Sequence, residues 1–187
     1  MAIVAMLVIG AALFAGGSLG SSSAYSVDDI DNACDLVDPV PLNRWEDQHD
    51  KTEHEETSKF GSADGSLRCL IRNQDFNDVA ELVLTASVNA EWAEDNFRTG
   101  KNLDQIGAEV VEIPDLGQQA YFRSDSEGCH HSADGSCLEH TIVVRDDDLL
   151  LRVRLLVEVG SGRAINDSEV AEVARVYVER AIASLRK

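Results

Sequence analysis

The chain has 187 residues, of which 34 are acidic and 16 are basic, so its formal net charge at pH 7 is −18. This charge excludes a surface that neutralises nucleic-acid phosphates and a polybasic face that docks on anionic lipid. A content of 44% hydrophobic and 27% charged residues is typical of a folded domain. The length favours one domain.

The first 25 residues carry no charged side chain. An unbroken apolar run extends from Ala2 to Ala15, and glycines and serines follow it. Two interpretations stay open: a transmembrane anchor through Ala2-Leu19, or a signal peptide cleaved after Ala24. Both place residues 26–187 outside the membrane as a single extracytoplasmic domain, either anchored to the cell membrane or secreted.

The next segment predicts two helices and then a polar stretch. Residues 26–37 have an apolar stripe at helical spacing behind Ser26, which can cap a helix. Pro39 ends this helix, and Pro41 opens a second, short one. Residues 46–58 are rich in charge, and we interpret them as a solvated helix end or loop.

Alternating apolar and polar residues then predict an antiparallel sheet of about five to six strands. A helix at residues 91–106 interrupts them. In the last strand Leu151, Val153 and Leu155 line one face, while Arg152 and Arg154 point to the other. The expected strands cover residues 66–73, 81–90, 109–113, 119–123, 138–145 and 149–160.

The C-terminal segment predicts a long amphipathic helix, with Asn166 and Glu169 at the spacing of a capping box. The predicted class is therefore α+β, with helices packed mainly on one face of the sheet. Residues 62–66 and 132–136 share the sequence Ser-Ala-Asp-Gly-Ser ahead of similar segments. A ββα duplication would explain this, and so would the common use of these residues in turns.

Four cysteines follow the leader, and an oxidising compartment favours disulfides between them. Cys129 and Cys137 flank a short polar loop and are expected to pair, which leaves Cys34 for Cys69. The alternative is a metal-binding exported protein that uses the segment from Cys129 to His140. Two thiolates and two imidazoles suit zinc, although Cys-x₇-Cys is not a usual zinc spacing. The candidate metal or ligand loop comprises His130, His131, His140, Glu127 and Asp134.

Three short motifs carry a family resemblance. They are Ala33-Cys34-Asp35-Leu36-Val37-Asp38-Pro39, the strand cysteine Cys69, and the segment from Ile113 to Tyr121, before a hairpin and an amphipathic helix. In these the chain resembles actinobacterial exported cell-envelope domains of unknown function, often lipoproteins with a cysteine pair. The resemblance implies a non-catalytic α+β domain outside the membrane. Two departures are the missing lipid-bearing cysteine and Leu70, where an aromatic residue is common after the strand cysteine.

The sequence contains neither a P-loop nor a G-x-G-x-x-G fingerprint, and its five histidines do not define a catalytic triad. We therefore expect no enzyme, no catalytic residues and no cofactor. The expected function is a disulfide-stabilised binding or sensory domain of the cell envelope. Its partner would be a small ligand or an envelope protein, not a nucleic acid. The alternative is a structural or assembly partner in an envelope protein complex.

Overall fold

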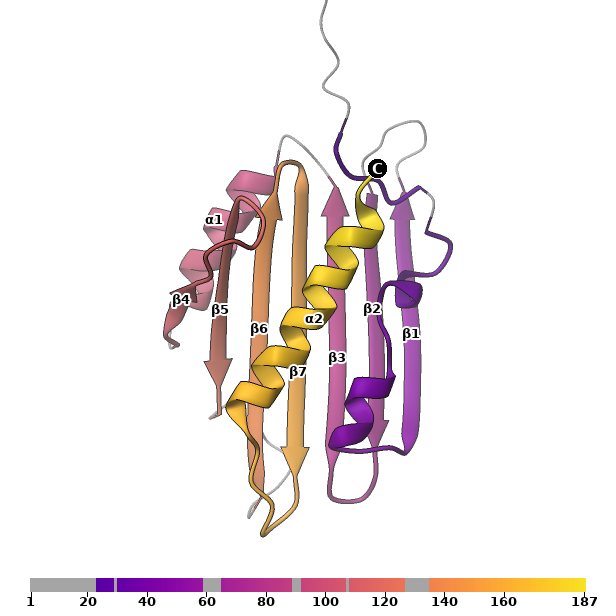
Figure 1. The fold of residues 1–187 in the computed structure, drawn as a ribbon, viewed down its shortest axis with the longest axis vertical. Helices are drawn as coiled ribbons and strands as arrows, with labels where there is room; N and C mark the ends of the chain where they lie inside the picture. The colour runs from indigo at the N-terminus through magenta and orange to yellow at the C-terminus, as the bar shows by residue number, and fades with distance from the viewer. Residues whose placement is uncertain (1–22, 29, 59–64, 89–91, 107, 127–134) are drawn as a thin grey trace, which may run out of the picture.

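The computed structural model describes residues 23–28, 30–58, 65–88, 92–106, 108–126 and 135–187. In these residues seven strands form one antiparallel sheet in the order β1-β2-β3-β7-β6-β5-β4 (Figure 1). This confirms the α+β class, with slightly more strands than expected. The strands are β1 (His49–Ser58), β2 (Gly65–Gln74), β3 (Val79–Val88), β4 (Val110–Glu112), β5 (Gln119–Asp125), β6 (Ser136–Asp146) and β7 (Leu149–Val159).

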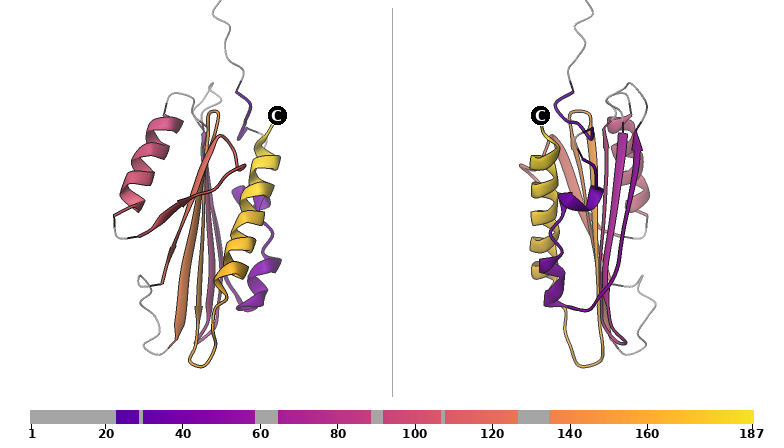
Figure 2. Two further views of the ribbon diagram at one scale, coloured as in Figure 1. Left: turned by 60° about the vertical axis from the view of Figure 1, so that its left-hand side comes forward. Right: turned by 90° about the vertical axis from the view of Figure 1, so that its right-hand side faces the viewer.

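Helices lie on both faces of the sheet (Figure 2). The long C-terminal helix α2 (Asp167–Leu185) packs on one face, beside the 3₁₀ turns η1 (Ala33–Leu36) and η2 (Val40–Arg44). Helix α1 (Ala93–Asp104) lies on the other face. The chain thus contains two ββα runs, β2-β3-α1 and β6-β7-α2, but their helices cover opposite faces.

The main core lies between the sheet and α2. Leu151, Val153 and Leu155 of β7 are fully buried there, opposite buried residues of β3. Asn166 begins α2, since its side chain accepts a hydrogen bond from the backbone N–H of Ser168. The buried face of α2 consists of Val170, Val173, Ala174, Tyr177, Val178, Ala181 and Leu185.

The segment before the sheet completes this core. A disulfide joins Cys34 in η1 to the fully buried Cys69 in β2, as predicted, with Cα atoms 4.9 Å apart. The helix expected at residues 26–37 is reduced to η1. The reason is that Asn32 is extended and its side chain accepts from the Cys34 N–H, so a new turn starts there.

Most of the polar stretch expected to be a helix end or loop forms the strand β1 instead. This strand pairs with β2 at one edge of the sheet. Its residues 49–57 are exposed, so no apolar residue is needed on either of its faces, and the alternation that marks a strand is missing. Charged side chains on an edge strand also discourage pairing with other chains.

None of the helices in the described residues has the length and hydropathy needed to cross a membrane. The predicted anchor, Ala2-Leu19, lies outside those residues.

We expect the double substitution Cys34→Ala/Cys69→Ala to lower the free energy of unfolding by about 3.8 kcal/mol. This value follows from the entropy of closing a loop with a sequence separation of 35. Urea unfolding of both proteins measures it. The same loss should appear in the native chain after reduction, and an unchanged unfolding midpoint would contradict the assigned role.

Candidate functional site

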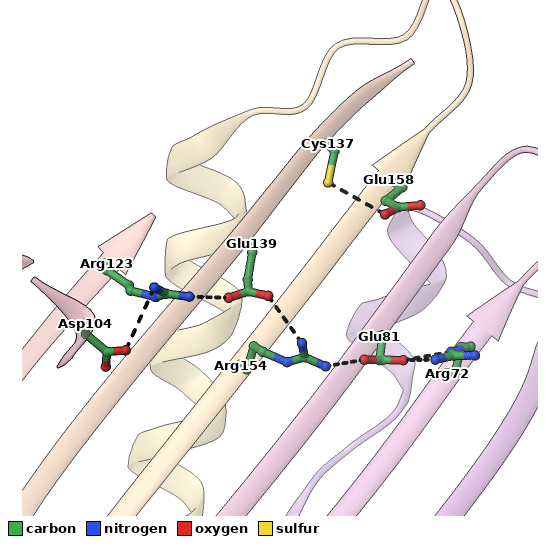
Figure 3. A network of polar contacts seen from close by, with 8 residues as sticks. All are labelled: Arg72, Glu81, Asp104, Arg123, Cys137, Glu139, Arg154 and Glu158. Atoms are coloured by element: carbon green, nitrogen blue, oxygen red, sulfur yellow. Dashed lines mark hydrogen bonds and ion pairs between the residues drawn. The ribbon is translucent and has the colours of Figure 1, made fainter. Parts of the chain in front are cut away.

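The face of the sheet opposite α2 carries a continuous network of ion pairs. It runs from Arg72 on β2 through Glu81, Arg154, Glu139 and Arg123 to Asp104 at the end of α1 (Figure 3). Acidic and basic side chains alternate along this path. The network therefore links strands far apart in the sequence to the helix on the same face.

Glu81 is the most deeply buried carboxylate of the network, with 5% of its side chain exposed. Its Oε1 accepts from Arg154 Nη2 at 2.5 Å, and its Oε2 accepts from Arg72 Nε at 2.7 Å. A buried carboxylate loses its hydration, and two charge-assisted bonds offset that cost. Glu81 thus fixes the positions of both arginines.

Glu139 connects the centre of the sheet to β5. Its Oε2 accepts from Arg154 Nη1 at 3.3 Å, and its Oε1 accepts from Arg123 Nη2 at 2.9 Å. Within the described residues, Nε of Arg123 is buried and has no hydrogen-bond partner. A buried donor without an acceptor costs free energy, so this N–H group does not itself stabilise the fold.

Asp104 closes the network from the side of α1. It accepts from Arg152 Nη2 at 2.5 Å and from the Tyr121 hydroxyl at 2.7 Å. Burial, and secondly the hydrogen bond to Asp104, raise the pKa of Tyr121, which therefore stays protonated as a donor. Phe97 of α1 packs edge-on against the Tyr121 ring with centroids 5.3 Å apart, and this contact holds α1 over β5 and β6.

Part of this network lines an open groove of about 440 Å³, which we call the arginine groove. Its arginines and carboxylates sum to a charge of +1, in a chain of net charge −18. Guanidinium N–H groups supply its donors, carboxylates its acceptors, and threonines line it as well. The groove is lined by Val83, Thr85, Asp104, Arg123, Glu139, Thr141, Arg152 and Arg154.

Two arginines of the groove have N–H groups that can bind a further acceptor. The side chains of Arg152 and Arg154 are 44% and 37% exposed. Among the hydrogen bonds of the described residues, Arg152 donates one to Asp104, and Arg154 donates one each to Glu81 and Glu139. A guanidinium has five N–H donors, so both can also bind an acceptor in the groove.

The residues predicted as a metal or ligand loop are only partly described. Cys129, and with it the expected Cys129–Cys137 pair, lies outside the described residues. So do the other loop candidates Glu127, His130, His131 and Asp134.

Cys137 and His140 of β6 point to opposite faces of the sheet. The sulfur of Cys137 lies 3.9 Å from Glu158 Oε1, on the face of the arginine groove. His140 is buried on the α2 face, where its Nδ1 is 2.7 Å from Ser124 Oγ and its ring stacks on Phe122. One tetrahedral ion therefore cannot take both side chains from this strand.

A group of acidic residues also lies at one end of the sheet. Oxygen atoms of Glu46, Asp75 and Asp78 lie within 4.8 Å of one another. Asp75 accepts backbone hydrogen bonds from Asn77 and Asp78, and these bonds lower its pKa. Asp78 pairs with Arg163, so these contacts organise the loops around the cluster.

The arginine groove was not predicted from the sequence. Alternation along the last strand predicted that Arg152 and Arg154 share one face, which the structure confirms. Charged residues inside apolar strands, such as Glu81 in β3 and Glu139 in β6, were the available clue. The arginines that pair with these two carboxylates could be identified only once the order of the strands in the sheet was known.

No protein-family model, curated protein or solved structure matches the chain.

We expect Asp104→Asn to lower the free energy of unfolding by about 1.5–3 kcal/mol, because it removes a mostly buried charge that Arg152 and Tyr121 both bind. The matched control is Asp95→Asn, which breaks the exposed pair with Arg98. The control should cost only about 0.2–1 kcal/mol. Urea unfolding compares the two, and equal losses would contradict the structural role of Asp104.

We expect the stability of the native chain to fall between pH 7.5 and pH 5.5 partly because of His140. Burial lowers the pKa of His140, with a weaker opposite effect from Asp167. The unfolded chain then takes up a proton near the ordinary value of about 6.5 before the folded chain does, and this favours unfolding. Urea unfolding at both pH values should show a smaller fall in His140→Gln. The control His54→Gln, on the exposed strand β1, should show the full fall; identical falls in all three proteins would refute this assignment.

Proposed function

We propose that the chain is an extracytoplasmic, non-catalytic binding domain and that the arginine groove is its binding site for a small anion. The observation that carries the proposal is the pair of half-exposed guanidinium groups of Arg152 and Arg154, held in place by buried carboxylates. Preorganised arginines bind carboxylate and phosphate groups well because their donors form a rigid fork.

A contribution to folding stability does not by itself explain why this face of the sheet carries a network of ion pairs. Ion pairs that lose their hydration contribute little net free energy, and an apolar face covered by a helix would serve stability as well or better. Here α1 covers one part of the face, where Phe97 contacts Tyr121 and Val143. The charged part stays accessible as a groove, as a ligand site requires.

The sequence and the disulfide support an extracytoplasmic location. The uncharged leader suits either an anchor in the cell membrane or an export signal. The Cys34–Cys69 disulfide suits an oxidising compartment. The resemblance to actinobacterial cell-envelope domains, argued above from three short motifs, agrees with the same location.

Binding is favoured over catalysis by the state of the groove's carboxylates. Asp104 and Glu139 each already accept hydrogen bonds from guanidinium groups. They hold arginines in position, and this role differs from that of a general base, which must be able to take a proton from a substrate.

We expect lactate, a singly charged carboxylate, to raise the melting temperature of the chain relative to sodium chloride at the same ionic strength. A ligand that binds only the folded state stabilises it by mass action. Differential scanning fluorimetry measures the rise, which should disappear in Arg152→Gln/Arg154→Gln.

The control for that experiment is Arg175→Gln, which loses one positive charge from an exposed pair on α2. It should retain the full rise. If the groove variant responds to lactate as strongly as the control, the arginine groove is not the binding site.

A further inference from the structure

The residues of the arginine groove indicate which kind of anion it binds. This inference rests on the proposed function, that the groove is an anion-binding site. We infer that the groove binds a singly charged carboxylate that also carries several hydroxyl groups on a ring, namely an acidic sugar of the uronic-acid type. Charge, donor and acceptor pattern, and size each support this class.

The charge of the groove matches one negative charge. Arg123, Arg152 and Arg154 contribute three positive charges, and Asp104 and Glu139 remove two. A dianion such as a phosphate ester would leave an excess negative charge in the groove. It would also approach against the field of a chain with a net charge of −18. A monoanionic carboxylate leaves no excess charge in the groove and meets about half of that repulsion.

The polar groups of the groove suit a ligand that both donates and accepts hydrogen bonds. Arg152 lies opposite Thr85 of β3, and Arg154 lies opposite Thr141 of β6. The guanidinium groups donate to the carboxylate of the ligand. Hydroxyl groups of the ligand can donate to Asp104 or Glu139 and accept from arginine, because a hydroxyl does both.

The size and floor of the groove suit a sugar ring. A volume of about 440 Å³ lies at the small end of ligand pockets. Arg152 and Arg154 are two residues apart on one strand, so their Cα atoms are separated by about 7 Å. Val83 lies on β3, opposite Arg154, and offers an apolar contact for the C–H groups of a ring.

Isothermal titration calorimetry of the full chain tests this class with four probes: D-glucuronate, D-glucose, D-glucose 6-phosphate and lactate. We expect D-glucuronate to bind about tenfold more tightly than each of the other three. Arg152→Gln and Arg154→Gln should each weaken D-glucuronate binding by about tenfold or more, and Arg175→Gln should leave it unchanged.

Three results overturn the inference. Equal binding of D-glucuronate and lactate, or tighter binding of D-glucose 6-phosphate, rejects the acidic sugar but retains the groove as an anion site. Absence of binding by all three anions rejects the class and the proposed function together. A further titration with a short polymer of uronic-acid units distinguishes a free sugar acid from a polysaccharide as the ligand. Tighter binding of the polymer than of D-glucuronate is expected only if the ligand is a polysaccharide.

Discussion

Side chains alternate along β7 between the apolar core on one face of the sheet and the arginine groove on the other. Leu151, Val153 and Leu155 point into the core under α2, and Arg152 and Arg154 between them point into the arginine groove. A shift of the register by one residue would exchange the two sets and bury the arginines among apolar side chains. The core and the groove are thus fixed by the same pairing of β7 with β3 and β6.

The two faces of the sheet are held by different forces. On the α2 face, apolar burial and the Cys34–Cys69 disulfide fasten the helix and the N-terminal segment. On the opposite face, a small apolar contact around Phe97 positions α1, and the end of that helix presents Asp104 to Arg152. The stable half of the molecule therefore serves as a rigid support for the polar half, as a preorganised site requires.

Much of the fold was predictable from local patterns. The hairpin of β6 and β7, the long terminal helix with its Asn166 cap and the Cys34–Cys69 pair all follow from residues close in sequence or from simple pairing. The strand β1 was not predictable in this way, because an exposed edge strand needs no apolar alternation. The prediction of a helix at residues 26–37 was also wrong. The side chain of Asn32 binds the backbone N–H of Cys34, and this local hydrogen bond competes with helix formation.

The arginine groove depends on contacts that no local pattern contains. Arg154 reaches Glu81 from a strand that lies 73 residues away in sequence. The two are diagonal neighbours, since Arg154 lies opposite Val83 in the register, and long side chains span such a diagonal. Knowing which charged residues face one side of a strand was not enough. The order β3-β7-β6-β5 was needed to bring them together.

Direct binding of an anion by Arg152 and Arg154 is the basis of the proposed function. Nuclear magnetic resonance of the arginine Nε–Hε groups, recorded while lactate is added to the labelled full chain, tests it most directly. We expect saturable shifts for Arg152 and Arg154 and constant signals for the exposed Arg98 and Arg175. Equal, non-saturating shifts at all four arginines, or constant signals at Arg152 and Arg154, would contradict it.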